Sequence, residues 1–350
     1  MVFTTPAIRA LRLHFPDSRI TYVVEPVAAA IVTHNPHIDE VIVAPRKKGL
    51  AGLRIDLGIA RRLRASRYDL AIDFHGGPRA ALLTWLSGAT IRIGYEIVGR
   101  SWMYTRRVAR PRALRARHAV ENQWDLLAPL AIGPPDPAAY PVEMPVDAPA
   151  AAAAATRLTR AGVGRDEEVI VIHVSAGNAF RRWPLASFAS VAAGLVARDR
   201  RRAVVVTSGP SESDAAALVT AGAREQLQAC DRERVLACGE FSLPELRALV
   251  EHAALFIGGD SGPMHIAATS RVPIVTLYGP TLPARSAPWR PDGSRSAAVE
   301  TLDLPCRPCD QRICAPGDFR CLTWIQPQQV LEAAERLIAA PRAKRASAKM

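Results

Sequence analysis

Three neighbouring residues have the types and the position to bind an anion: Asp260, Ser261 and Gly262, which follow a run of small and apolar residues. Pro263 comes next, as is typical of the first turn of a helix, and the helix-like run after it carries His265. A helix that begins here presents unpaired backbone N–H groups and the positive end of its dipole, which suits a diphosphate. In the simpler alternative, Asp260 and Ser261 only cap the helix and His265 packs in a core.

Alternating strand-like and helix-like segments place this turn in an α/β fold. The runs that indicate strands in the first half of the chain are 19–25, 38–44, 68–74 and 90–95. Helical patterns separate them, and the same alternation resumes in the second half. This pattern predicts mostly parallel sheets covered by helices on both faces. Ligands of such sheets bind beyond the carboxyl ends of the strands, where the turn at Asp260 is expected to lie.

A stretch rich in proline and alanine divides the chain into two halves. We expect a Rossmann-like domain over 1–135, a linker over 136–165, a second Rossmann-like domain over 166–326, a helix over 327–340 and a basic tail over 341–350. Two such domains are expected to face a central cleft.

Composition limits the class of protein and of partner. Hydrophobic residues make up 49% of the 350 residues, which is enough for packed cores. The chain has no run of about 18 apolar residues and its first residues lack the apolar region of a secretory signal, so we expect a cytoplasmic protein. The net charge of +12 favours an anionic partner such as a nucleotide, a phosphorylated lipid, a membrane surface or nucleic acid. A genome rich in GC, with its bias toward Arg and Ala, is an alternative explanation of the charge.

Several segments in collinear order resemble glycosyltransferase family 9, best known for the ADP-heptose:lipopolysaccharide heptosyltransferases. They are HVSAGNAFRRWPLASFASVAAGL at 173–195, TSGPSESDAAALV at 207–219, the stretch 260–288, and the segments 4–42 and 69–95. The resemblance implies the GT-B fold, with the acceptor on the first domain and the nucleotide sugar on the second. It also implies transfer with inversion of a sugar, expected to be heptose, from ADP-heptose to a lipopolysaccharide-core-type acceptor, with no metal needed for catalysis.

The resemblance also implies roles for residues on the donor side. The sequence Asp260-Ser261-Gly262 resembles the family turn that holds the diphosphate, and His265 matches the histidine that follows it. Arg181, in RRWP, stands where the family usually has a lysine, and a cation there would stabilise the departing nucleotide diphosphate. Its alternative is a solvated surface residue.

Glu212 resembles the acid that binds the ribose of the nucleotide. The alternative for Glu212 is an acid that a helix dipole favours in its first turn.

Acceptor binding is expected in the first half of the chain. His75 and Gly76 follow a strand, and with Arg79 they form a candidate acceptor-side turn, although a plain strand-to-helix turn is equally consistent. The stretch 100–117 carries seven arginines and no acid, which suits an anionic glycolipid acceptor and a peripheral contact with the inner membrane surface. Nucleic acid is the competing partner, but no RNA-binding signature accompanies the arginines.

The expected general base is absent from the chain. In the family, a segment like the one that begins at Met1 follows a strand and a loop ending in Gly-Asp, and that Asp is the expected base. We therefore expect the first strand of the first domain to be missing, and the protein to start about 10–15 residues upstream, the length of one strand and a turn. A real truncation is the alternative, and Asp73 and His75 are weak substitutes for the base.

Two other functions stay open. A binder of nucleotide sugars that has lost its catalysis would keep the same fold, and a GT-B epimerase would rearrange the nucleotide sugar without any acceptor.

Four cysteines, Cys306, Cys309, Cys314 and Cys321, have the spacing C-x2-C-x4-C-x6-C. Four thiols brought together could hold a structural zinc ion, or could pair as disulfides in an oxidising compartment. The absence of a secretory signal favours reduced thiols, with a structural zinc ion as one of the alternatives.

Overall fold

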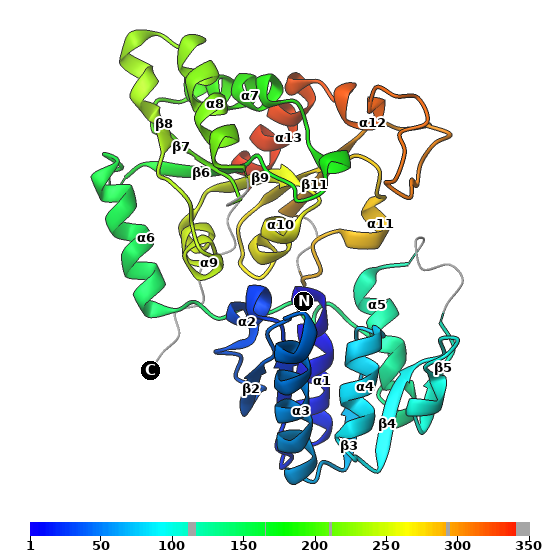
Figure 1. Ribbon diagram of the computed structural model, residues 1–350. Helices are drawn as coiled ribbons and strands as arrows, with labels where there is room; N and C mark the ends of the chain where they lie inside the picture. Colours follow the sequence, from blue (N-terminus) through cyan, green and yellow to red (C-terminus); the bar gives the residue numbers. More distant parts are fainter. Residues whose placement is uncertain (111–116, 165, 210–211, 292–294, 341–350) are drawn as a thin grey trace. The chain divides into compact units, whose positions relative to one another are not determined.

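The structure, a computed structural model, describes residues 1–110, 117–164, 166–209, 212–291 and 295–340. It divides into two compact units that each alternate strands and helices (Figure 1). Unit 1 comprises Met1–Pro145 and Ala284–Pro291, and unit 2 comprises Val146–Pro283 and Asp292–Met350. All strand pairings among the described residues are parallel, which confirms the predicted α/β class.

Unit 2 contains one sheet with the strand order β11-β10-β9-β6-β7-β8. The strands are β6 (Glu168–His173), β7 (Arg202–Thr207), β8 (Val235–Ala237), β9 (Leu255–Gly259), β10 (Ile274–Tyr278) and β11 (Ser296–Glu300). Every residue of β7, β9 and β10 is buried. Their β-branched and apolar sequences suit strands covered on both faces, because a parallel sheet is buried between helices.

Helices cover both faces of this sheet (Figure 1). One layer holds α7, α8 and α13, and the other holds α6, α9 and α10. Their bounds are α6 (Ala148–Arg160), α7 (Leu185–Arg198), α8 (Ser213–Glu225), α9 (Leu243–His252), α10 (Gly262–Ala267) and α13 (Pro327–Ala339); the short helices α11 (Pro283–Ser286) and α12 (Arg320–Thr323) lie in loops. The expected C-terminal helix is confirmed as α13, which packs on α7 where Gly194 leaves room for Leu331. The expected basic tail, 341–350, lies outside the described residues.

Unit 1 contains two small parallel sheets, β1-β2 and β3-β4-β5. Its strands are β1 (Thr21–Val24), β2 (Glu40–Val43), β3 (Leu70–Ile72), β4 (Ile91–Tyr95) and β5 (Arg106–Val108), and its helices are α1 (Thr5–His14), α2 (Pro26–Val32), α3 (Gly49–Ala65), α4 (Pro78–Leu86) and α5 (Ala119–Trp124). Among the described residues no strand joins β1 to β3. Instead, the hydroxyl of Tyr68 donates to the side-chain oxygen of Thr21 at 2.7 Å and links the starts of the two strands.

The expected linker over 136–165 differs from the structure, because α6 lies within it. Asp147 caps this helix by accepting a hydrogen bond of 3.0 Å from the N–H of Ala150, Pro149 occupies its first turn, and an alanine run follows. These are standard signals for the start of a helix, and they outweigh the linker-like composition.

The chain also returns to unit 1 at residues 284–291, which the sequence did not indicate. Trp289 packs on the ring of His118 with centroids 4.7 Å apart, and its Nε1 donates to the main-chain oxygen of Tyr140 at 2.9 Å. No helix of the described residues has the length and the apolar sequence to cross a membrane.

Candidate functional site

The strand order of unit 2 determines which loops meet. β6, β7 and β8 follow one another across the sheet, and the chain then returns to the other side of β6 to form β9. Ligands of open parallel sheets bind beyond the carboxyl ends of the strands at such a reversal. The loop after β6 carries Arg181 and the turn after β9 carries Asp260, so these two residues flank the reversal.

Asp260 is the buried centre of this site, with an exposed fraction of 2%. Its Oδ2 accepts a hydrogen bond of 2.5 Å from the hydroxyl of Thr281, in the loop after β10. Nη1 of Arg181 lies 3.4 Å from the same Oδ2 and donates to the main-chain oxygen of Asp260 at 3.0 Å. Nε2 of His265 lies 3.6 Å from Oδ1. The carboxylate therefore holds together the loops after β6, β9 and β10 and the first turn of α10.

The turn after Asp260 offers donors to a ligand. Ser261 is the N-cap residue of α10, but its side chain makes no capping hydrogen bond. The first N–H groups of an α-helix have no partner within the helix. The buried hydroxyl of Ser261 has no hydrogen-bond partner in the described part of the chain, and a side chain at Gly262 would extend into open space. The structure therefore lacks the simple side-chain cap, and the hydroxyl and the N–H groups are available to an anion.

Two glycines at the end of β9 let the neighbouring loops approach it. A Cβ at Gly259 would lie 3.2 Å from the main-chain oxygen of Arg181, and a Cβ at Gly258 would lie 3.2 Å from that of His173. Both distances are shorter than ordinary contacts, so a side chain at Gly259 would displace the loop that carries Arg181 and one at Gly258 would displace the end of β6.

Arg181 is held from two directions. Its Nε donates to Oε1 of Gln311 at 2.8 Å, while Nη1 bonds to the main-chain oxygen of Asp260. Two residues later, Trp183 is fully buried and its Nε1 donates to the main-chain oxygen of Ile325 at 3.2 Å. The sequence RRWP therefore combines a buried anchor with a cation at the site, and Arg181 is not the free surface residue of the alternative.

Glu212 lies in the loop after β7 and is engaged by the neighbour of Arg181. Its Oε1 lies 2.7 Å from Nε of Arg182, which also donates to the main-chain oxygen of Ala176 at 2.9 Å. The ion pair joins the loops after β6 and β7. A contact between Glu212 and a ribose stays a prediction.

A histidine at the end of β6 lies below these loops and carries no charge. Burial lowers the pKa of His173 to about 4, and its Nδ1 lies 3.0 Å from the hydroxyl of Thr207. His173 is therefore a neutral, hydrogen-bonded core residue at neutral pH.

The candidate acceptor-side turn in unit 1 is organised by Asp73. Oδ1 of Asp73 accepts the N–H groups of His75 at 2.9 Å and of Gly76 at 2.8 Å, and Oδ2 accepts the hydroxyl of Tyr104 at 2.6 Å. Gly76 has a φ of +70°, which favours glycine. These bonds occupy both oxygens of Asp73, while the side chain of His75 is exposed and its Nδ1 accepts the N–H of Gly77 at 3.1 Å.

Arg79 joins three segments of unit 1. Its Nε and Nη2 donate to Oδ1 of Asp56 at 3.0 and 2.6 Å, and its other bonds reach the main-chain oxygens of Ala44 and Pro45. The guanidinium thus stabilises the end of β2 against α3 and α4. The expected contact of Arg79 with an acceptor stays a prediction, as does that of the stretch 100–117, of which residues 111–116 lie outside the described part.

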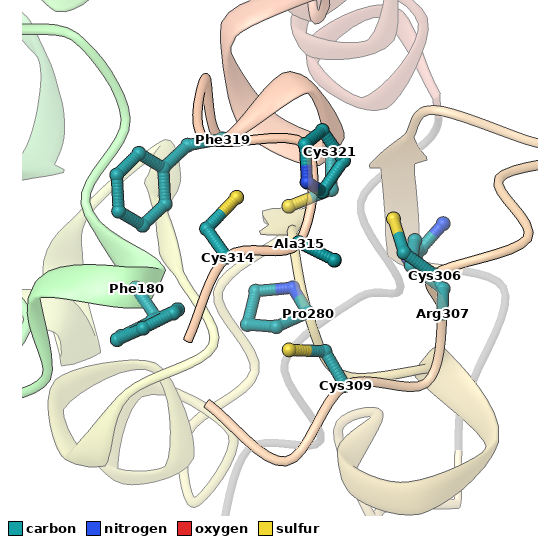
Figure 2. A pocket seen from close by; sticks show the side chains of 10 residues that line it. Phe180, Pro280, Cys306, Arg307, Cys309, Cys314, Ala315, Phe319 and Cys321 are labelled. Atoms are coloured by element: carbon teal, nitrogen blue, oxygen red, sulfur yellow. The ribbon is translucent and has the colours of Figure 1, made fainter. Parts of the chain in front are cut away.

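The four clustered cysteines line one pocket (Figure 2). All of them are free thiols, and burial raises the pKa of Cys321. The sulfur of Cys309 accepts the N–H of Gln311 at 3.3 Å. Within the described residues, no three metal-ligating side chains converge to the distances of a metal site. The spacing therefore correctly indicated a cluster, and the zinc ion stays a prediction.

Sequence reasoning missed two residues that support the site, Thr281 and Gln311. Thr281 follows a buried strand in the sequence GPT, so its place at the carboxyl edge was a usable signal. Gln311 is 130 residues from Arg181 in the chain, and nothing in the local sequence indicates that contact.

Comparisons with known proteins identify relatives along nearly the whole chain. The profile of glycosyltransferase family 9 (heptosyltransferase) matches residues 57–318. Lipopolysaccharide heptosyltransferase 3 of Escherichia coli is 31% identical over 316 residues, which cover 89% of each chain.

Solved structures show the same architecture. A family 9 glycosyl transferase from Veillonella parvula DSM 2008 is similar with a TM-score of 0.80 and 26% identity, over 96% of this chain and 93% of that chain. An E. coli heptosyltransferase solved with ADP is similar with a TM-score of 0.67 and 21% identity, over 96% of this chain and 95% of that chain.

Proposed function

This chain belongs to glycosyltransferase family 9, and we propose that it transfers heptose from ADP-heptose to a lipopolysaccharide-core-type acceptor with inversion at the anomeric carbon. It has the GT-B fold of its structural neighbours and is a glycosyltransferase. The observation that supports the proposal most is the arrangement of Arg181, Asp260 and Ser261 at the strand reversal of unit 2. A cation lies there beside a buried hydroxyl and the first N–H groups of a helix, and this combination suits a diphosphate.

The proposed reaction is a single displacement. An acceptor hydroxyl attacks the anomeric carbon of the donor, the bond from that carbon to the diphosphate oxygen breaks, and ADP leaves with the electron pair. A carboxylate takes the proton of the hydroxyl. Asp73 does not suit this role, because its Oδ1 accepts two N–H groups of the turn at His75 and its Oδ2 accepts the hydroxyl of Tyr104.

In this proposal, residues of this chain stabilise the leaving group. Negative charge grows on the diphosphate as the bond breaks, and donors already fixed in place stabilise that charge without rearranging. Arg181 supplies a positive charge, while the hydroxyl of Ser261 and the N–H groups of α10 supply hydrogen bonds. In this proposal no divalent cation is needed.

The molecules bound in two solved structures that resemble this chain support ADP as the leaving group. One structural neighbour is an E. coli heptosyltransferase in complex with ADP, and another is in complex with ADP-2-deoxy-2-fluoro heptose. Both bound molecules carry a diphosphate, the group that the turn at Asp260 suits.

An exposed aromatic patch in unit 1 supports a peripheral contact with an anionic membrane surface. The rings of Trp85 and Trp102 pack edge-to-face with centroids 5.4 Å apart, yet these residues are 40% and 57% exposed. Val98 is 99% exposed in the same connection between β4 and β5, and Arg106 and Arg107 follow it, both exposed. Tryptophan favours the lipid–water interface, and arginine favours anionic headgroups.

Replacing Trp102 by alanine is expected to weaken binding to vesicles of phosphatidylglycerol and phosphatidylethanolamine by roughly 30-fold, since burying one large apolar side chain contributes about 2 kcal/mol. Co-sedimentation with the vesicles measures this. Trp324→Ala is the matched control, because Trp324 is 52% exposed in unit 2. Equal binding of both variants and the unchanged protein would argue against this surface.

We further propose a structural zinc ion on Cys306, Cys309, Cys314 and Cys321, from their spacing and their shared pocket. The chemistry of the donor set fits zinc, although the thiols as they stand do not converge to ligating distances.

Freshly purified protein is expected to contain close to one zinc ion per chain, measured by elemental analysis. Cys314→Ser should lower that content, and Cys230→Ser should not, because Cys230 is an exposed thiol outside the cluster. A zinc content well below one per chain in the unchanged protein rules the site out.

Incubation with a panel of nucleotide sugars and a truncated lipopolysaccharide acceptor tests the proposed function. Transfer of heptose from the ADP donor supports it. A rearranged nucleotide sugar without transfer would favour an epimerase, and binding without turnover would favour a protein that has lost its catalysis.

A further inference from the structure

The segment that carries the clustered cysteines, residues 306–321, contacts the loop that carries Arg181. We call this segment the cysteine loop. Oε1 of its residue Gln311 accepts hydrogen bonds from Nε of Arg181 at 2.8 Å and from Nδ2 of Asn178 at 2.9 Å. The rings of Phe319 and Phe180 pack edge-to-face beside the pocket, with centroids 5.2 Å apart (Figure 2). The two segments are therefore joined by polar and by apolar contacts.

The cysteine loop also contacts the loop that carries Thr281. The N–H of Cys309 donates to the main-chain oxygen of Pro280 at 3.0 Å, and Nη2 of Arg307 donates to that of Thr281 at 2.9 Å. Because the side chains of Arg181 and Thr281 both bond to Asp260, the cysteine loop holds both of the loops that surround this carboxylate.

Gln311 has its own support within the loop. Its backbone lies in the left-handed region, with a φ of +61°, which is uncommon for a residue other than glycine. The sulfur of Cys309 accepts its N–H at 3.3 Å. A continuous series of hydrogen bonds thus runs from the thiol of Cys309 through Gln311 and Arg181 to Asp260.

The bonds of Arg181 decide which side of its guanidinium remains for a ligand. Nε points to Gln311 and Nη1 to Asp260, whereas Nη2 makes no hydrogen bond to any residue that the structure describes. A planar guanidinium held at two corners presents its third in one fixed direction, which reduces the entropy lost when it binds an anion.

We infer that Gln311 is a positioning residue for Arg181, and that the cysteine loop sets the direction in which this cation faces the donor diphosphate. The inference rests on the proposed function only for the identity of that ligand. Gln311 itself need not touch the donor, because it acts through the Nε of Arg181.

Chemical modification of Arg181 tests the link without relying on any activity. Phenylglyoxal reacts with accessible guanidinium groups, and peptide mass spectrometry reports the rate at Arg181. Gln311→Ala should raise that rate severalfold. Gln328→Ala is the matched control, because Gln328 is an exposed residue of α13 whose amide bonds to Glu332 and does not contact Arg181. An unchanged rate in Gln311→Ala overturns the inference.

A double-mutant cycle on Arg181 and Gln311 tests the consequence for the ligand. Gln311→Ala should weaken ADP binding by roughly tenfold, as expected for the loss of one hydrogen bond to a charged group. In the Arg181→Ala background the same change should have no further effect, because its target is gone. Gln311→Glu, which still accepts from Nε, should keep Arg181 protected from phenylglyoxal.

The outcomes separate the inference from the proposed function. Equal losses from Gln311→Ala in both backgrounds would overturn the positioning role. If the unchanged protein binds ADP but transfers no sugar, the proposed function fails, and the modification rates and the binding cycle still decide the role of Gln311.

Discussion

Arg181→Ala should lower kcat for sugar transfer by roughly 100-fold or more while the protein stays folded. Removing one fixed donor that stabilises charge in a transition state costs about this much. Arg181 is the cation nearest to Asp260 in the site, and its guanidinium is bonded to that residue's main-chain oxygen at 3.0 Å. Because the charge on the diphosphate grows during the reaction, kcat should fall more than the affinity for the donor. Steady-state kinetics with ADP-heptose measure both quantities.

Two further variants make this expectation specific. Arg181→Lys should retain more activity than Arg181→Ala, because a lysine keeps the charge, but less than the unchanged protein, because it loses the fork that bonds to Gln311 and Asp260. Arg312→Ala should behave like the unchanged protein, since Arg312 is an exposed arginine of the cysteine loop. A kcat of Arg181→Ala within about twofold of the unchanged protein would remove Arg181 from the reaction, since a lost transition-state interaction must appear in the rate.

Asp260→Asn should lower kcat/KM by roughly 100-fold, with a much smaller effect on folding. The amide has nearly the same size, and its oxygen can still accept the hydroxyl of Thr281. The change removes the negative charge that orients Arg181 and His265, at 3.4 and 3.6 Å. Misorientation of a catalytic group is enough by itself to lower a rate by about 100-fold. Activity per folded molecule and a thermal unfolding curve measure the two effects separately.

Thr281→Val is the matched control for Asp260→Asn. It removes the 2.5 Å hydrogen bond to the carboxylate but keeps the charge, so it should cost about 1–3 kcal/mol of stability and a smaller part of kcat/KM. If Asp260→Asn unfolds the protein while the activity per folded molecule stays unchanged, then Asp260 serves folding alone.

Sequence patterns were sufficient to predict the strands in the sheet of unit 2 and the position of the turn at Asp260. The runs that form β6, β7, β9 and β10 are apolar or β-branched and short, as expected for strands buried on both faces. The order of strands then places the ends of β6 and β9 side by side. Local sequence was therefore enough to locate Asp260 at the carboxyl edge of the sheet.

Contacts over long separations in the chain were beyond the same reasoning. The sequence did not indicate that Arg79 bonds to Asp56 and to two main-chain oxygens of unit 1. Packing between loops likewise brings Arg182 to Glu212 and Gln311 to Arg181. A residue type shows which bonds a side chain can form, and only the fold shows which partner takes them.

The most direct test of the proposed transfer is the mass of a truncated lipopolysaccharide acceptor after incubation with ADP-heptose and the purified chain. The mass is expected to increase by one heptose residue, with one ADP released per acceptor modified, and no increase is expected with Arg181→Ala. An acceptor of unchanged mass, in the presence of bound and intact ADP-heptose, would contradict the assignment of sugar transfer to this site.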